Sequence, residues 1–192
     1  MLHPATTLKE VDPAIGLGVF ASELIPRGSL IWVRDPLDQV LTPAEIAALP
    51  ALCSADLEHY FWQNKHGDYV LCWDIARYVN HACDPNCIST EWGFEIAVRD
   101  IRPGQELSND YANIGMMPTE RMPCRCGAPD CRGLISSADA AAKTPLWAST
   151  IAASLTELNR VRQPLWPLLP VALQESLRSR YPATPYPDGQ AG

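Results

Sequence analysis

The sequence predicts a mostly β domain of short strands and short helices, followed by an α-helical appendage at its C-terminal end. Up to about residue 111, short apolar runs are separated by glycine and proline turn signals. Beyond about residue 138, alanine and leucine are frequent and the apolar residues recur at helical spacing. The chain has 192 residues, 47% of them hydrophobic, which is enough to build one domain with a core of its own.

The first 35 residues have the pattern of two strands joined by a turn. Residues 16–21 form a short apolar run entered through two glycines, and residues 29–33 form a second apolar run. The turn signal between them is Ile-Pro-Arg-Gly at positions 25–28. We therefore expect a hairpin-like opening to the domain.

Two short helices are expected next. Thr42 and Glu45 have the spacing of a capping box, and Pro43 stands at the first helical position. These residues predict a helix that continues to about Leu49. Residues 54–62 are expected to form a second helical stretch.

Strand character returns in the middle of the chain. Residues 68–73 are predicted to form a strand, and residues 94–99 alternate between apolar and polar side chains. Residues 80–87 are rich in turn formers, and the Arg-Pro-Gly at 102–104 marks a further turn before residues 106–111. The body of the domain is therefore expected to consist mainly of short strands.

The C-terminal part is predicted to be helical. Residues 138–181 are rich in alanine and leucine, and a second helix is expected over residues 171–180. Prolines between the two helices separate them, and the tail from residue 182 to 192 is expected to be disordered. The helices could pack on the domain or form a dimer interface. The residues at helical spacing in the first helix are Trp147, Ile151, Leu155 and Leu158.

The charge balance restricts the possible partners. The chain has 15 Lys and Arg against 22 Asp and Glu, a formal net charge of −7. This makes direct nucleic-acid binding unexpected and favours a basic protein or peptide as partner. The sequence contains no signal-peptide pattern and no apolar run long enough for a membrane helix, so we expect a soluble cytoplasmic protein.

The cysteines predict a metal site. Their number, seven, is odd and their distribution is uneven, which favours metal binding in a reducing compartment over a disulfide framework. Cys124, Cys126 and Cys131 supply three ligands, so a closed tetrahedral zinc needs a fourth from a distant segment. Cys83 and its competitor Cys87 are the candidates. Because four thiolates leave no open position for water, such a zinc would be structural.

Four motifs follow one another along the chain. They are Gly16-x-Gly18, Arg77-Tyr78-Val-Asn80-His81-x-Cys83-x-Pro85-Asn86, Glu106-Leu-x-x-Asp110-Tyr111 and the Cys-x-Cys-x4-Cys cluster that starts at Cys124. In this order they resemble the SET-domain protein lysine methyltransferases with a post-SET zinc motif, and the compact chain with short loops is similar to small bacterial members.

The resemblance spans about residues 12–135 and implies a SET-domain, β-clip-like fold. It also implies a pseudoknot that brings the segment around Asn80 and His81 to residues 106–111. It divides the chain into a SET domain at 7–121, a post-SET zinc motif at 122–135 and a C-terminal helical extension at 136–192.

The resemblance also implies an activity and a set of site residues. The activity is S-adenosylmethionine-dependent transfer of a methyl group to a lysine of a protein, with Tyr111 as the catalytic residue. The missing side chains of the two glycines would let the backbone approach the cofactor. The implied zinc ligands are Cys83, Cys124, Cys126 and Cys131. The implied cofactor-binding residues are Gly16, Leu17, Gly18, Arg77, Tyr78, Asn80 and His81.

The chain departs from the family pattern at three places. Residues 32–36 stand where the family has a tyrosine-containing segment lining the lysine channel. Asn109 stands where many eukaryotic members have the Phe or Tyr that helps set the number of methyl groups added. Leu134 and Ile135 replace the tryptophan that often follows the zinc motif, and the periodicity around Trp147 favours a place in the helix core over a role as lid.

The altered segment at residues 32–35 keeps a second hypothesis open, a catalytically inactive SET-fold module that binds a peptide or the cofactor. The substrate protein, the degree of methylation and the oligomeric state do not follow from the sequence. The two remaining cysteines, Cys53 and Cys72, are expected to be small buried apolar residues.

Overall fold

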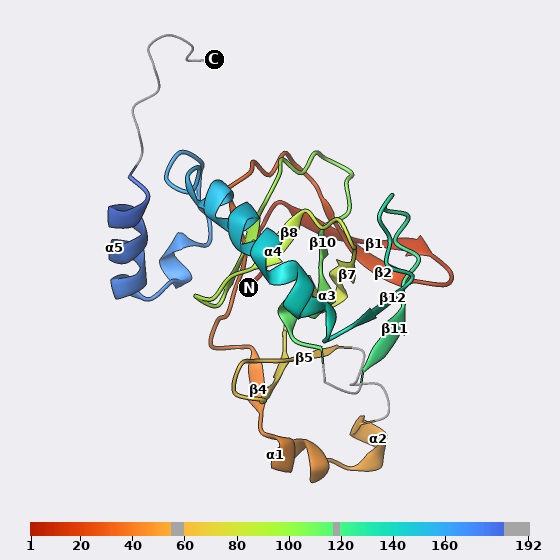
Figure 1. The fold of residues 1–192 in the computed structure, drawn as a ribbon. Coiled ribbons are helices and arrows are strands. Elements are labelled where there is room, and N and C mark those ends of the chain that lie inside the picture. The colour runs from red at the N-terminus through yellow and green to blue at the C-terminus, as the bar shows by residue number, and fades with distance from the viewer. Residues whose placement is uncertain (55–59, 117–119, 183–192) are drawn as a thin grey trace.

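The computed structural model describes residues 1–54, 60–116 and 120–182. Figure 1 shows a body of short strands with a long helix across it. The strands are β1 (Thr6–Asp12), β2 (Gly16–Ala21), β3 (Leu30–Val33), β4 (Gln39–Leu41), β5 (Phe61–Gln63), β6 (Tyr69–Leu71), β7 (Asn80–His81), β8 (Cys87–Ser89), β9 (Phe94–Ala97), β10 (Ser108–Asn109), β11 (Arg121–Pro123) and β12 (Leu134–Ser136). The helices are α1 (Pro43–Ala47), α2 (Ala51–Ser54), α3 (Tyr111–Ile114), α4 (Asp139–Leu155) and α5 (Val171–Arg180), with 3₁₀ turns η2 (Ile75–Tyr78) and η3 (Trp166–Leu168).

The strands form small sheets. Within the described residues these are the antiparallel pairs β1-β2 and β11-β12, the three-stranded sheets β3-β9-β8 and β4-β6-β5, and the parallel pair β7-β10. The opening hairpin turns at Asp12, whose carboxylate accepts hydrogen bonds from the backbone N–H groups of Ala14 and Ile15. The predicted class, mostly β with short helices and a helical C-terminal part, is confirmed.

The sheet β3-β9-β8 separates two hydrophobic cores. Successive residues of a strand point to opposite faces, so Phe94 and Ile96 lie on one face while Ala97 lies on the other. Phe94 and Ile96 belong to the core that contains the C-terminal helices. We call this side of the sheet the helix face. Ala97 belongs to the core shared with the β1-β2 hairpin and η2, which we call the cavity face.

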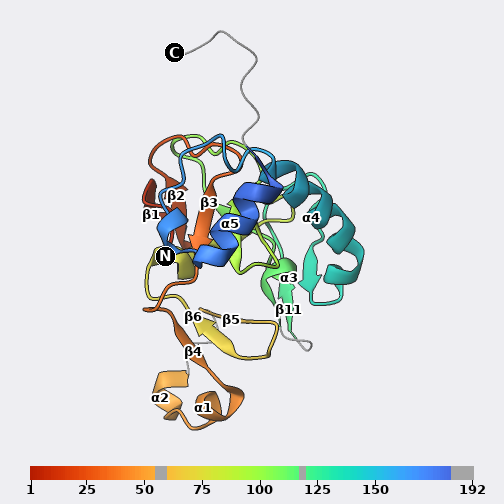
Figure 2. The same cartoon turned by 90° about the vertical axis from the view of Figure 1, so that its left-hand side faces the viewer.

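The C-terminal helices pack on the domain. Figure 2 shows α4 and α5 beside the central strands, and Trp147, Leu155 and Leu177 are buried in the helix-face core. Between these helices, Gln163 donates to the carbonyl of Gly28 and accepts from the N–H of Leu30, both at 2.8 Å. The segment is therefore part of the domain core, and the expectation that Trp147 is a helix-core residue is confirmed.

Several predicted elements agree with the structure. Residues 16–21 and 29–33 match β2 and β3, and the helix predicted over 171–180 is α5. At α1, the Thr42 hydroxyl accepts from the N–H of Glu45 and the Glu45 carboxylate accepts from the N–H of Thr42, which completes the capping box.

Other predictions were wrong or lie outside the described residues. The helix predicted over residues 54–62 is wrong at its end, because Phe61 and Trp62 are in β5, where pairing with β6 outweighs local helical preference. Residues 55–59 of that prediction, and the tail at 183–192, lie outside the described residues. Cys53 is exposed, contrary to expectation, whereas Cys72 is buried. None of the described helices is long and apolar enough to cross a membrane.

Candidate active site

Two segments far apart in the chain meet at the pair β7-β10. Ser108 lies opposite Asn80, and Asn109 lies opposite His81, in a parallel register. The side chain of Asn86 holds the β10 segment in place, since its oxygen accepts from the N–H of Ser108 at 2.9 Å. The pairing joins the two segments that the pseudoknot expectation required to meet.

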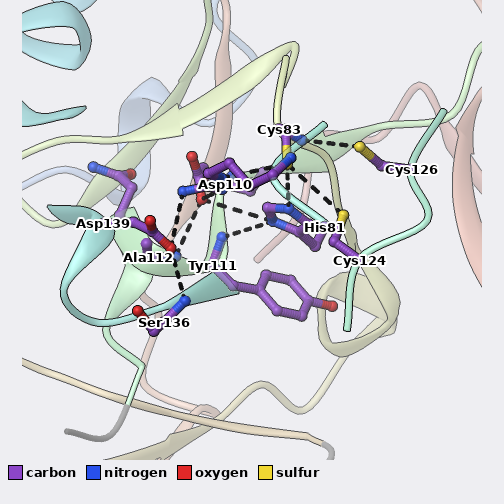
Figure 3. A network of polar contacts seen from close by, with 12 residues as sticks. His81, Cys83, Asp110, Tyr111, Ala112, Cys124, Cys126, Ser136 and Asp139 are labelled. Carbon is purple, nitrogen blue, oxygen red and sulfur yellow. Dashed lines mark hydrogen bonds and ion pairs between the residues drawn. The ribbon is translucent and has the colours of Figure 1, made fainter. Parts of the chain in front are cut away.

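Tyr111 lies two residues after the end of β10 and lies against His81 (Figure 3). The N–H of Tyr111 donates to Nδ1 of His81 at 3.2 Å, and the two ring centroids are 5.4 Å apart. Because Nδ1 accepts this bond, the proton of the neutral ring is placed on Nε2, which lies 3.4 Å from the sulfur of Cys83. Burial lowers the pKa of His81, although the nearby carboxylate of Asp110 opposes this shift.

The hydroxyl of Tyr111 has a fixed orientation. It donates to the carbonyl of Val79 at 3.1 Å, which uses its one proton and leaves the oxygen lone pairs free to accept. Burial, with smaller contributions from Glu106 and Glu120, raises the pKa of Tyr111 to about 12. The phenol therefore stays protonated at neutral pH and can orient a donor group without acting as a base.

Cys83 lies with Cys124, Cys126 and Cys131 in one cluster. All four sulfur atoms are within 4.8 Å of one another, and the sulfur of Cys124 is 3.7 Å from that of Cys83 and 3.6 Å from that of Cys131. Tetrahedral zinc with Zn–S bonds of about 2.3 Å requires sulfur atoms roughly 3.8 Å apart. The cluster fits this ion. The competitor Cys87 is buried elsewhere, in the cavity-face core.

Arg132 connects the cysteine cluster to the base of Tyr111. Its backbone N–H and its Nε both donate to the sulfur of Cys83 at 3.4 Å, and its Nη2 donates to the buried carboxylate of Asp110 at 2.7 Å. Asp110 in turn caps α3, which begins at Tyr111. Donors to ligand sulfur reduce the charge on the thiolate and orient it. Sequence reasoning did not identify Arg132, whose only signal is its place directly after Cys131.

A cavity of about 740 Å³ opens beside this network. Its volume is within the range of small-molecule sites. Most of the sequence-predicted cofactor and catalytic residues line it, whereas Gly18 and His81 are not among its described lining residues. The predicted residues that line the cavity are Gly16, Leu17, Arg77, Tyr78, Asn80 and Tyr111.

The family follows from comparison with known proteins. The sequence profile of the SET domain matches residues 16–112, which is half of the chain. The chain belongs to the SET-domain family. The match includes the glycine motif, the paired segments β7 and β10, and Tyr111.

The SET domain of this chain is similar to segments of much longer proteins. It is 30% identical over 131 residues to histone-lysine N-methyltransferase ash1 of Drosophila melanogaster and 32% identical over 133 residues to histone-lysine N-methyltransferase Set2 of the same organism. Both alignments cover 62% of this chain and 6% of the relative. A histone-lysine N-methyltransferase specific for H3 lysine-36 from Schizosaccharomyces pombe is 34% identical over 132 residues, covering 62% of this chain and 16% of the relative. The chain therefore spans only a small part of these relatives.

Gly18 of the SET domain is required for close packing within the protein. A Cβ atom there would lie 2.5 Å from Oε1 of Glu106 and 2.9 Å from Nδ2 of Asn80. Nδ2 of Asn80 donates to the same Glu106 oxygen at 2.7 Å and to the carbonyl of Leu17 at 3.1 Å. The missing side chain thus lets Asn80 and Glu106 hold the backbone at Leu17, which is a reason within the chain itself for a glycine at this position.

The altered segment of this SET domain also reaches the cavity. Trp32 lines it and meets Trp62 edge to face, with ring centroids 5.8 Å apart. Glu95 lines the same cavity. Sequence reasoning missed Trp62 because residues 54–62 were assigned to a helix. It missed Glu95 because a charged residue in an alternating strand normally faces solvent.

Proposed function

We propose that the protein is an S-adenosylmethionine-dependent protein-lysine N-methyltransferase. The observation that supports this best is the position of Tyr111. The β7-β10 pairing and the bond to His81 fix it in the wall of a cavity that Gly16 and Asn80 also line. The relatives that resemble the domain are named histone-lysine N-methyltransferases.

The residues around the cavity suit S-adenosylmethionine, which would supply an electrophilic methyl group on its sulfonium. Gly16 and Leu17 offer backbone groups, and Asn80 fixes their position through its bond to the Leu17 carbonyl. The guanidinium of Arg77 lies 5.4 Å from the ring centre of Tyr78, so a cation and an aromatic face stand together in the wall. A cation suits the carboxylate of S-adenosylmethionine, and an aromatic face suits its adenosyl group. His81 would act on this site by positioning Tyr111.

The chain's own contribution to the reaction would be to prepare the lysine amine. A lysine with an ordinary pKa of about 10.4 is almost entirely protonated at neutral pH, and an ammonium has no lone pair to attack with. An apolar, aromatic wall that includes Trp32 and Tyr111 lowers that pKa by removing water. The hydroxyl of Tyr111, whose proton is held by Val79, can then accept an N–H of the amine and orient its lone pair.

The four cysteines would hold a structural zinc ion. The ion would join Cys83, two residues after His81, to the segment with Cys124, Cys126 and Cys131. With four sulfur ligands it would have no open position, so its role would be to keep this segment beside the catalytic tyrosine.

The substrate would be a lysine on a basic protein. The net charge of −7 favours a partner rich in lysine and arginine. Relatives named for H3 lysine-36 and H3 lysine-4 act on such a protein, although this chain spans 16% or less of their length.

Two measurements test the proposal. Calorimetric titration with S-adenosylhomocysteine should show one site per chain, and transfer of labelled methyl groups to mixed core histones or other basic proteins should then be detectable. Binding without transfer to any basic protein would favour the inactive binding module, and no binding at all would refute the proposal.

Replacing Tyr111 by Phe tests the catalytic tyrosine. We expect Tyr111→Phe to lower the rate of methyl transfer roughly a hundredfold, because the ring keeps its packing on His81 but the hydroxyl no longer orients the amine. The affinity for S-adenosylhomocysteine should change less than about threefold, since the ring stays in the cavity wall. Equal rates in the two forms would contradict the role of the hydroxyl.

A further inference from the structure

Glu95 is a carboxyl group inside the cavity. Alternation along β9 sends Phe94 and Ile96 to the helix face and Glu95 to the opposite, cavity face. In the register of the central sheet, Glu95 lies between Trp32 on β3 and Ser89 on β8. It lines the cavity that Tyr111 also lines.

The carboxylate of Glu95 has polar neighbours but no cation. One oxygen accepts from the hydroxyl of Ser89 at 3.1 Å, and the amide of Asn109 also bonds to the carboxylate. Glu95 forms no ion pair within the described residues. The N-terminal ammonium interacts with it only weakly through space, because that ammonium pairs with Asp35 at 2.6 Å. A buried charge without a partner is costly, so this position favours a cation that comes from outside the chain.

Two thiols near Glu95 are neutral at physiological pH. The thiols of Cys72 and Cys87 face it, and burial is the main reason that their pKa values are raised. Burial likewise raises the pKa of Glu95 to about 7. The N-terminal ammonium acts on this carboxylate only at a distance, because it pairs with Asp35, so the carboxylate remains available to an incoming cation.

The rest of this part of the cavity also suits a cation. Trp32 and Trp62 meet edge to face, and aromatic rings attract cations, most strongly tryptophan. The side chain of Trp32 is only 5% exposed, so little water screens the attraction between these rings and a cation.

We propose that Glu95 binds the ammonium group of the incoming lysine side chain before the amine loses its proton, and so selects an amine as the substrate of this cavity. This inference rests on the proposed lysine methyltransferase function and names the group that recognises the target. Asn109 and Ser89 position the carboxylate, and Trp32 with Trp62 encloses the side chain that enters. This role gives a physical reason for the polar Asn109 at a position where many eukaryotic family members have Phe or Tyr.

A matched pair of ligands tests this without knowledge of the substrate protein. In each, a nitrogen replaces the sulfonium of S-adenosylmethionine and bears an arm in place of the methyl group. One arm ends in a primary amine, with two to four carbons, and the other is the alkyl chain of equal length. The wild-type protein should bind the amine form roughly tenfold or more tightly than the alkyl form, because a partly desolvated ion pair is made only with the amine.

The Glu95→Gln variant should bind the two ligands with affinities within about threefold of each other, since the amide keeps the shape but lacks the charge. Glu91→Gln is the matched control, because Glu91 precedes the same strand but is exposed, and it should keep the full preference. Binding of S-adenosylhomocysteine to Glu95→Gln shows that the variant is folded.

The outcomes separate this inference from the function on which it rests. If the wild-type protein does not bind S-adenosylhomocysteine, the proposed function fails. If it binds, but Glu95→Gln retains the preference for the amine, only the role of Glu95 fails. Should the variant not fold, carbon-13 resonances of the glutamate carboxyl groups in the wild-type protein decide: one buried carboxyl must shift with the amine ligand and not with the alkyl ligand, and the absence of such a shift overturns the inference.

Discussion

The two faces of the central sheet differ in what they bury. The helix face buries apolar side chains such as Phe94, Ile96 and Leu155, which are at most 1% exposed. The cavity face, one residue along the same strand, places Glu95 beside Trp32. The first arrangement stabilises the fold, whereas the second leaves a carboxyl without a cation and an indole without an acceptor, at a cost in stability. The difference indicates that the cavity face is arranged for a ligand.

Removal of zinc should have the largest effect, and that effect should be a loss of ligand binding at the cavity face. We expect one zinc ion per chain by elemental analysis, and we expect a chelator to abolish binding of S-adenosylhomocysteine. The reason is that the ion would hold Cys83 beside His81, which bonds to Tyr111.

The helix face should survive that treatment, because α4 and α5 pack on it without contributing a cysteine to the cluster. Most of the far-ultraviolet helical signal should therefore remain. A metal-free protein that binds S-adenosylhomocysteine as tightly as before would contradict this assignment.

Truncation of Phe94 should have the next largest effect. That effect should be a loss of stability through the helix face. Phe94 is 1% exposed, so Phe94→Ala should lower the free energy of unfolding by about 3–5 kcal/mol through lost burial and a cavity. Chemical denaturation measures this loss. At a temperature where the variant is still folded, its affinity for S-adenosylhomocysteine should be unchanged, and a large loss of affinity would show that the two faces are coupled.

The Glu95→Gln substitution should stabilise the protein at high pH. The carboxyl has a pKa of about 7 when folded against an ordinary value of 4.5, so the folded state keeps its proton longer. The stability of the wild type should therefore fall as pH rises from about 4.5 to about 7. At pH 8 the variant should be more stable by up to ~3 kcal/mol, and at pH 5 by about 1 kcal/mol or less.

Denaturation of both forms across this pH range checks the expectation. The thiols of Cys72 and Cys87 ionise well above this range, so they do not contribute to the difference. A difference that does not depend on pH would mean that the pKa of Glu95 is the same in the folded and the unfolded protein.

Local sequence patterns predicted those helices and strands that neighbouring residues determine. The capping box at Thr42 and Glu45, the apolar run of β2 and the bounds of α5 all follow from neighbouring residues. Prediction failed where a distant partner decides the structure. Trp62 was assigned to a helix but pairs with Val70 in a strand, and the alternation of residues 94–99 did not show that Glu95 lines a cavity.

The sequence by itself determined the family, the four cysteines and the identity of Tyr111, because these depend on residue types at fixed spacing in ordered motifs. Only the tertiary structure decided which groups surround them. A strand's alternation tells which residues share a face but not what covers each face. Whether Glu95 faces water or a cavity lined by Trp32 depends on chain segments more than thirty residues away, whose packing no local pattern encodes.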